Sequence, residues 1–311
     1  MTAPVIVCGS MAFDTIMLFD GHFKDHILPD QIHTLSVSFL VPGMRKEFGG
    51  CSGNIAYSLR LLGGNPIPVA TVGVDAEDYL ARLRGLGIET RWVRVAGETF
   101  TAQCFITNDL SDNQITAFHP GAMALSAGND LTEAPGEWGI VAPDAKDAMF
   151  AHAERLHARG IPFVFDLGQA MPLFDKADLE RMLGLAQVLT VNDYEGHVVE
   201  QRIGRSMREI ATGLQAVVVT RGAEGATLYE NGEQVQIAAV KPDAVVDPTG
   251  CGDAYRAGLL YGVTNGWRWA DACRLASVMG AIKVAHRGPQ NHQPTREEIA
   301  RRLKDAYGLE M

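Results

Sequence analysis

One segment of the chain holds the residues best suited to chemistry. It reads Val-Val-Asp-Pro-Thr-Gly-Cys-Gly-Asp-Ala-Tyr-Arg-Ala-Gly over residues 245–258. Its two valines predict the end of a strand, its glycines predict a turn, and a helix is expected to begin near Gly252. Backbone amides at a helix start bind anions, and glycine lets a phosphate approach the backbone. Asp253 is expected in the first helical turn.

A carboxylate beside an anion site, aimed at a hydroxyl, is what phosphoryl transfer to an alcohol requires. Asp253 would accept the hydroxyl proton, and the preceding turn would bind the transferred group. A plain helix N-cap is the simpler interpretation of the same residues, because Asp and Gly are common there.

A second segment, residues 47–56, reads Glu-Phe-Gly-Gly-Cys-Ser-Gly-Asn-Ile-Ala. Gly49 and Gly50 would let a polyol approach the backbone, and the Asn54 side chain can both donate and accept hydrogen bonds. Asn54 also stands at the start of a predicted helix, residues 55–62, where it could be a cap. Asp14 follows the first predicted strand, where a lone aspartate is usually a turn residue.

Two further loops follow predicted strands. Asn192 and Glu195 stand about one helical turn apart in Asn-Asp-Tyr-Glu, and an amide and a carboxylate so placed can orient a hydrated Mg²⁺. Residues 220–225, Thr-Arg-Gly-Ala-Glu-Gly, follow another apolar run. The simpler interpretation of this second loop is a hairpin turn.

The elements that must position these residues show one repeated pattern along the chain: short apolar runs alternate with segments of helical periodicity. We expect buried strands at residues 5–9, 139–142, 162–166, 188–192 and 216–220. We expect helices at residues 145–158, 178–185, 206–213, 253–263, 269–285 and 295–307. This alternation predicts a doubly wound, mostly parallel α/β sheet flanked by helices. Ligands of such sheets bind beyond the carboxyl ends of the strands, which places Asp14, Asp166, Asn192 and Thr220 at the functional edge.

Two regions do not follow this alternation of apolar runs and helical segments. Residues 15–45 lack a helical period, and residues 99–107 and 113–118 are predicted to pair around a polar turn at 108–112. We expect a small β lid, formed by about 15–45 and 99–118, over the main sheet of a single domain that spans residues 1–311. Edge strands without a lid function are the alternative.

Composition and charge exclude several classes of protein. The formal net charge of −10 argues against nucleic acid as a partner, because binding its backbone requires a basic surface. The five cysteines show no metal-ligand spacing, and no apolar run approaches membrane-spanning length. We therefore expect a cytoplasmic protein that binds no membrane. The GxxxxGK[ST], GxGxxG and HRD motifs are absent, so P-loop, dinucleotide-binding and protein-kinase interpretations lose their main support.

The segment at 245–258 resembles the C-terminal signature of the PfkB (ribokinase-like) family of carbohydrate and nucleoside kinases. The resemblance extends over roughly residues 5–299 and implies an ATP-dependent kinase. It assigns Asp253 as the general base and the turn Gly250-Cys251-Gly252 as the anion hole. Cys251 stands where alanine or glycine is usual, and a buried, inert thiol is the expected consequence.

The resemblance implies roles for other residues as well. Residues 47–56 resemble the family's N-terminal motif, in which Gly49, Gly50 and Asn54 contact sugar hydroxyls, while Asp14 would bind a vicinal diol. Asn192 and Glu195 match the family's NxxE motif, which organises Mg²⁺ through water near the phosphates of ATP. The remaining implied nucleotide contacts are Asn192, Thr220, Gly222, Gly225 and, against the adenine ring, Asn291.

The resemblance also implies two partners that short sequence motifs identify poorly, a monovalent cation and a second subunit. The resemblance implies a monovalent cation, K⁺, beside the anion hole, with Asp247 and Thr249 as candidate ligands. Lid strands pair between subunits in some members of the family, so a homodimer through the lid is open.

The acceptor is inferred from the lid. Residues 21–40 are similar to the lid region of bacterial and archaeal adenosine (nucleoside) kinases, and Phe39 and Phe105 could stack on a base while Gln103 binds its edge. The alternative is that these aromatic residues form the lid's own core. We expect phosphorylation of the 5′-hydroxyl of a nucleoside, with adenosine favoured over a sugar of the ribokinase or fructokinase type. A non-catalytic nucleotide-binding regulator is less well supported, because a pure binder has no use for a base.

Overall fold

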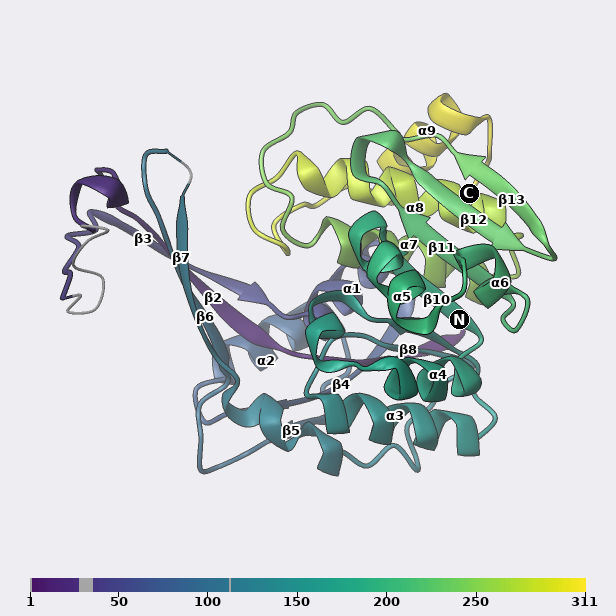
Figure 1. Ribbon diagram of the computed structural model, residues 1–311, viewed down its shortest axis with the longest axis horizontal. Coiled ribbons are helices and arrows are strands. Elements are labelled where there is room, and N and C mark those ends of the chain that lie inside the picture. Colours follow the sequence, from purple (N-terminus) through teal and green to yellow (C-terminus); the bar gives the residue numbers. More distant parts are fainter. Residues whose placement is uncertain (1, 28–35, 112) are drawn as a thin grey trace.

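The structure is a computed structural model that describes residues 2–27, 36–111 and 113–311. Its larger sheet has nine strands in the order β13-β12-β11-β10-β9-β8-β1-β4-β5 (Figure 1). Strands β5 to β11 of this order are parallel, and β12 and β13 are antiparallel at one edge. The strands are β1 Pro4–Cys8, β4 Asn65–Val72, β5 Val93–Val95, β8 Trp138–Val141, β9 Phe163–Asp166, β10 Val188–Asn192, β11 Ala216–Thr220, β12 Ala226–Glu230 and β13 Glu233–Ile237.

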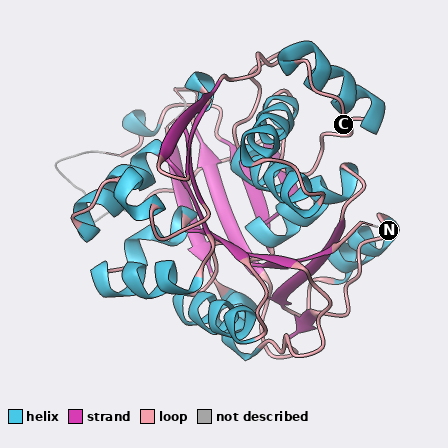
Figure 2. Cartoon of the chain, turned by 90° about the vertical axis from the view of Figure 1, so that its right-hand side faces the viewer, coloured by secondary structure: helices cyan, strands magenta, loops and turns pink. Residues whose placement is uncertain are grey.

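Helices cover both faces of this sheet (Figure 2). One apolar core lies between the sheet and α1, α7, α8 and α9, and a second lies between the sheet and α3 to α6. Because the inner strands are buried on both faces, they are apolar throughout rather than alternating. The helices are α1 Cys51–Leu61, α2 Glu77–Gly85, α3 Lys146–Ala158, α4 Lys176–Leu185, α5 Asp193–Ile203, α6 Met207–Ala211, α7 Cys251–Thr264, α8 Trp269–Val284 and α9 Arg296–Tyr307. None of the described helices is long and apolar enough to span a bilayer.

A separate four-stranded sheet, the lid sheet, projects from one side of the body (Figure 1). Its order is β3-β2-β6-β7, with β2 and β6 parallel and the outer pairs antiparallel. The strands are β2 Ala12–Leu18, β3 Gly43–Gly49, β6 Ala102–Asn108 and β7 Gln114–His119. The expected small sheet is confirmed, and the interpretation as simple edge strands is wrong. The sheet extends beyond both expected boundaries of 15–45, and residues 28–35 of that range lie outside the described residues.

The predicted parallel sheet and most of its predicted strands and helices are confirmed, and one strand is wrong. Val245 and Val246 belong to no strand, because they lie in an extended loop tied to the end of α8 by hydrogen bonds from Val246 N and Asp247 N to Val284 O. Strand β4 was not predicted, because it contains Pro66 and Pro68 and proline is uncommon inside a strand. These prolines precede the residues that pair with the short β5, so their missing N–H groups cost the ladder little.

Candidate active site

The N-terminus of α7 forms a glycine-rich turn at the carboxyl edge of the sheet. Gly250 has φ of 79°, a left-handed conformation that favours glycine, and a Cβ atom there would come within 2.7 Å of Pro289 Cβ. The helix begins at Cys251, one residue before the expected start. Cys251 N donates to Pro248 O at 3.1 Å, so Gly252 N and Asp253 N are the first-turn amides without a backbone partner among the described residues. Burial raises the pKa of the Cys251 thiol to about 11, so the thiol stays protonated. The turn can therefore bind an anion through its backbone amides.

Asp253 lies in the first turn of α7 and accepts a hydrogen bond of 2.8 Å from Asn54 Nδ2. Asn54 is not a helix cap, because α1 begins at Cys51 with Gly50 as its N-cap. It is instead an inward-facing, buried side chain of the first turn of α1. The structure thus brings together the two glycine-rich motifs, which are far apart in the sequence.

A chain of buried hydrogen bonds fixes the amide of Asn54. Gln290 Nε2 donates to Asn54 Oδ1 at 3.0 Å and to Tyr79 Oη at 2.6 Å, and Tyr79 Oη donates to Gly49 O at 2.7 Å. Because Asn54 Oδ1 accepts from Gln290, its Nδ2 must face Asp253. Sequence reasoning missed Tyr79 and Gln290, since neither belongs to a recognisable motif.

Burial raises the pKa of Asp253 to about 6, and the nearby charge of Asp166 adds to this effect. The hydrogen bonds from Asn54 and Cys51 and the charge of Arg256 act in the opposite direction. A carboxylate with this pKa is ionised at neutral pH and is a stronger base than an exposed aspartate.

Asp14 lies on β2 of the lid sheet and packs against Gly49, just before α1. A Cβ atom at Gly49 would come within 2.4 Å of Asp14 Oδ2, so only glycine leaves room for this carboxylate. Burial, reinforced by the charges of Glu47 and Asp247, raises the pKa of Asp14 to about 6. Asp14 thus contacts the residue that ends β3, and Asp253 is hydrogen-bonded to Asn54 in the first turn of α1, which follows β3.

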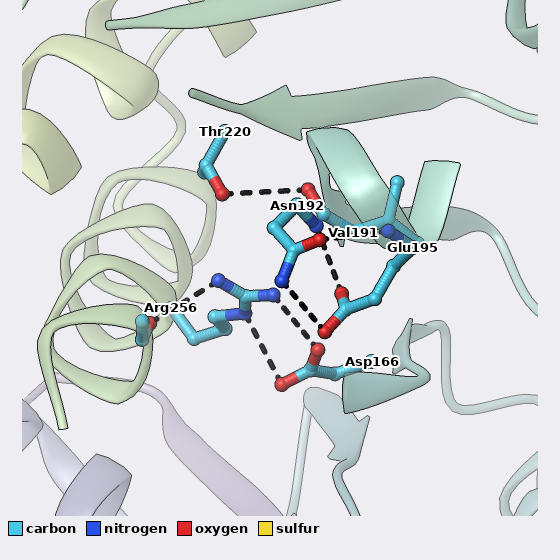
Figure 3. A network of polar contacts seen from close by, with 7 residues as sticks. Asp166, Val191, Asn192, Glu195, Thr220 and Arg256 are labelled. Carbon is cyan, nitrogen blue, oxygen red and sulfur yellow. Dashed lines mark hydrogen bonds and ion pairs between the residues drawn. The ribbon is translucent and has the colours of Figure 1, made fainter. Parts of the chain in front are cut away.

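A second polar network lies at the carboxyl ends of β9, β10 and β11 (Figure 3). The Arg256 guanidinium, one turn beyond the general-base candidate, forms a buried pair with Asp166, with contacts of 2.9 and 3.1 Å. Asn192 caps α5 through Glu195 N at 2.7 Å, and Glu195 accepts from Asn192 N and Nδ2. Burial raises the pKa of Glu195. The predicted pair Asn192 and Glu195 is therefore assembled at the sheet edge.

The fit of Mg²⁺ to this network can be judged from its donors. Each Glu195 oxygen accepts one hydrogen bond and keeps a lone pair, and Asp166 lies near enough to influence the pKa of Glu195. The described residues include no group of three or more His, Cys, Asp or Glu side chains that could hold a metal directly. The network fits a hydrated Mg²⁺ held through water and phosphate oxygens, as this ion prefers.

The nucleotide-side candidates are only partly brought together. Thr220 pairs with Asn192 in the sheet, and Gly222 and Gly225 shape the loop after it with φ of 52° and 90°. Asn291 differs from expectation, because its Nδ2 donates to Glu47 Oε2 of the lid sheet at 2.8 Å. In this structure its amide therefore links the C-terminal loop to the lid rather than facing the loop at Thr220.

Strand register decides which lid residues share a face of the lid sheet with Asp14. Asp14 is directly opposite Cys104, which is opposite Phe118, so these three side chains share one face of the lid sheet. Glu47 lies on the same face and contacts the C-terminal loop through Asn291, so this face looks toward α7. We call it the inner lid face. Ile16 and Ile106 extend it with apolar side chains.

The predicted base contacts do not lie on the inner lid face. Gln103 and Phe105 pair with Phe13 and Thr15 and point to the opposite face, where Gln103 Nε2 donates to Asp75 Oδ2 at 3.0 Å. Phe39 packs against Phe19, Phe23 and His26, with ring centroids 4.8, 5.1 and 5.9 Å away. It therefore belongs to the lid's own aromatic core, which was the alternative interpretation.

A family model described as pfkB family carbohydrate kinase matches residues 14–296. The chain belongs to the pfkB family of carbohydrate kinases. It is accordingly a phosphotransferase.

Solved structures and curated proteins place this pfkB kinase near nucleoside kinases. It is 51% identical to the nucleoside kinase of Burkholderia thailandensis in complex with inosine, with a TM-score of 0.89 over 98% of this chain and 99% of that one. A structure of the same protein in complex with ADP-inosine matches at 52% identity, with a TM-score of 0.87 over 98% and 97% of the two chains. The nucleoside kinase of Methanocaldococcus jannaschii is 28% identical over 86% of this chain and 89% of its own length.

The raised pKa of Asp253 predicts a pH-dependent gain in stability when its charge is removed. Folding raises this pKa from 3.8 to about 6, so the fold favours the neutral carboxyl group. The cost of ionisation grows as pH rises from about 4 to about 6 and is constant above that. Asp253→Asn should therefore be more stable than the wild type by up to about 3 kcal/mol at pH 7.5.

Urea unfolding at about pH 7.5 and about pH 5 measures this difference in the free energy of unfolding. The gap between variant and wild type should shrink at the lower pH, where part of the wild-type carboxyl is already neutral. An equal gap at both pH values would show that the charge of Asp253 is not what the fold disfavours.

Proposed function

We propose that this pfkB kinase transfers the γ-phosphoryl group of ATP to the 5′-hydroxyl of a nucleoside. The observation that carries the proposal is the hydrogen-bonded pair of Asn54 and Asp253 at the amide-rich start of α7. It combines a general base, a residue that orients it and an anion site. The similarity to a nucleoside kinase solved in complex with inosine supports the choice of acceptor.

Asp253 acts while the acceptor oxygen attacks the γ-phosphorus. A new P–O bond forms, the P–O bond to the ADP leaving group breaks, and the hydroxyl proton passes to a carboxylate oxygen of Asp253. The hydroxyl has a much higher pKa than the carboxyl group, so proton transfer accompanies the attack rather than preceding it. The products are the nucleoside 5′-phosphate and ADP.

The turn at Gly250, Cys251 and Gly252 stabilises the charge that develops on the transferred group. Its amides are fixed before the reaction, because the left-handed Gly250 and its contact with Pro289 determine how α7 begins. Preorganised donors of this kind need no reorientation in the transition state. Asp14 binds hydroxyls of the ribose, and the glycine pair keeps the approach to the backbone open.

Mg²⁺, when bound, neutralises charge on the phosphates of ATP. Asn192 and Glu195 would hold its water shell from the start of α5, and Thr220 with the loop at Gly222 and Gly225 would line the nucleotide beside them. The ion pair of Arg256 and Asp166 connects α7, which carries Asp253, to the edge of the sheet at Asn192 and Glu195. It would fix the position of Asp253 relative to the Mg²⁺ site.

The inner lid face supports a nucleoside rather than a free sugar. Beside the carboxylate of Asp14 it presents Ile16, Ile106 and Phe118, and the Phe118 side chain is 53% exposed. An apolar face next to a diol-binding carboxylate suits a base attached to a ribose. Adenosine is the acceptor we favour among nucleosides.

Asp253→Asn tests the mechanism. The substitution keeps the shape of the side chain and the hydrogen bond from Asn54, but removes its basicity. General-base loss costs on the order of 10²–10⁴ in rate, so kcat should fall by that factor while the KM for ATP changes by no more than about threefold. Steady-state kinetics measures kcat and the KM for ATP, and calorimetry with ADP checks that the variant still binds nucleotide. A folded variant with near-wild-type kcat would refute the role of Asp253.

The Mg²⁺ assignment predicts a change in metal requirement for Glu195→Gln. Loss of this carboxylate should lower kcat and raise the Mg²⁺ concentration needed for half-maximal rate by about tenfold, the effect expected for an outer-sphere ligand. Glu180→Gln is the matched control, because Glu180 lies on α4, outside the network, and among the described residues pairs only with the exposed Lys176. Mg²⁺ titrations that coincide for Glu195→Gln and the wild type would contradict the assignment.

The acceptor prediction concerns kcat/KM for adenosine, inosine, cytidine, ribose and fructose with ATP. Nucleosides should exceed the free sugars by at least tenfold, or about 1.4 kcal/mol of transition-state preference. Phe118→Ala, on the inner lid face, should raise the KM for nucleosides. Phe105→Ala, on the opposite face, should not. A free sugar that surpasses every nucleoside tenfold would identify a sugar kinase instead.

A further inference from the structure

Lys283 of α8 is buried next to the anion hole. Its side chain is inaccessible to solvent, yet its ammonium group forms no ion pair among the described residues. It donates instead to two backbone carbonyls, Asp247 O at 2.7 Å and His286 O at 3.0 Å. A buried ammonium held by carbonyl oxygens is an uncommon arrangement, because a lone buried charge is costly.

The two carbonyls belong to the loops that frame the anion hole. Asp247 precedes the turn at Gly250 by three residues, and His286 precedes the Gly288–Pro289 segment against which Gly250 packs. Asp247 also ties the loops together, because Oδ1 accepts from Thr249 N and Oδ2 accepts from Gly288 N, each at 2.9 Å. The ammonium therefore places one positive charge beneath the turn that must bind a phosphoryl group.

This arrangement does not fit the K⁺ ion expected at Asp247 and Thr249. The carbonyl of Asp247 already accepts from an ammonium, and both carboxylate oxygens already accept from amides. A K⁺ ion bound to the same oxygens would lie beside a like charge in a buried region, where repulsion is poorly screened. The carbonyl ligands and the single positive charge that K⁺ would need here are already matched by Lys283.

We propose that the Lys283 ammonium takes the place of a monovalent cation at the anion hole, so that turnover by this kinase does not depend on K⁺. Like K⁺, an ammonium group is a compact monovalent cation that backbone carbonyls can satisfy. Unlike K⁺, it is attached to the chain and cannot dissociate. The charges of Asp247, Asp253 and Glu47 favour its protonated form, against the effect of burial, which lowers the pKa of Lys283.

The wild-type enzyme provides the first test, which rests on the proposed kinase reaction. Turnover is measured with Tris-ATP, MgCl₂ and an acceptor, with choline chloride replaced stepwise by up to about 100 mM KCl at constant ionic strength, so that screening is unchanged. We expect kcat to vary by less than about twofold. A saturable increase of tenfold or more with KCl would overturn the inference.

Thermal unfolding gives a second test that needs no turnover. A cation that binds only the folded protein raises Tm with its concentration. The wild-type Tm should be the same in KCl and in choline chloride of equal ionic strength. A K⁺-specific rise would overturn the inference even if the proposed acceptor were wrong, so the two failures are distinguishable.

Lys283→Met removes the charge and keeps most of the stem. We expect kcat to fall by about tenfold or more, and KCl or NH₄Cl to restore part of it, because a free cation can then enter between the carbonyls. Lys304→Met, at an exposed lysine on α9, is the control and should change neither kcat nor its salt dependence. Full activity of Lys283→Met without K⁺ would overturn the inference. If that variant does not fold, the two wild-type tests decide.

Discussion

The hydrogen bond from Asn54 to Asp253 joins two helices whose N-termini must meet at one edge of the sheet. Its geometry depends on contacts that appear unrelated to chemistry. Tyr79 and Gln290 set the orientation of the Asn54 amide, and Gly258 lets α7 pack so closely on α8 that a Cβ atom would come within 2.6 Å of Ala276 Cα. The base is therefore placed by the packing of the body, not by the loop that carries it.

The candidate site contains three carboxylates with raised pKa values and two buried cations. Asp14, Asp253 and Glu195 are all partly buried carboxylates with raised pKa values, and each stands where a different part of the reaction is expected. Between them lie two buried cations, Arg256 paired with Asp166 and Lys283 held by carbonyls. Fixed positive charges keep neighbouring carboxylates ionised without exposing them to water. Binding of an anionic nucleotide thus needs little rearrangement of protein charge.

Local patterns in the sequence were sufficient to predict where the glycine-rich turn, Asp253 and the pair Asn192 and Glu195 lie in the fold. Asn192 ends the predicted strand β10, and the glycine pattern predicted the turn before α7, although no strand precedes that turn. The lid could not be predicted in this way. Gln103 and Phe105 were assigned to the acceptor, but the register with β2 turns them to the opposite face. A one-residue shift in register exchanges the faces, and no local signal fixes it. Lys283 was overlooked because its carbonyl partners lie in other segments of the chain.

The parallel pairing of β2 with β6 has a consequence for how the enzyme is made. Residues 12–18 cannot complete their sheet until residues 102–108 have been synthesised, and the chain between them forms α1, β4, α2 and β5. Pairing over such a separation carries a large loop-closure cost unless the intervening segment has already folded. During translation the body strand β4 should dock on β1 first and thereby deliver β6 to β2. The lid sheet, which carries Asp14, can then form before the ribosome has reached Asp253, so the two carboxylates join the fold at different stages of synthesis.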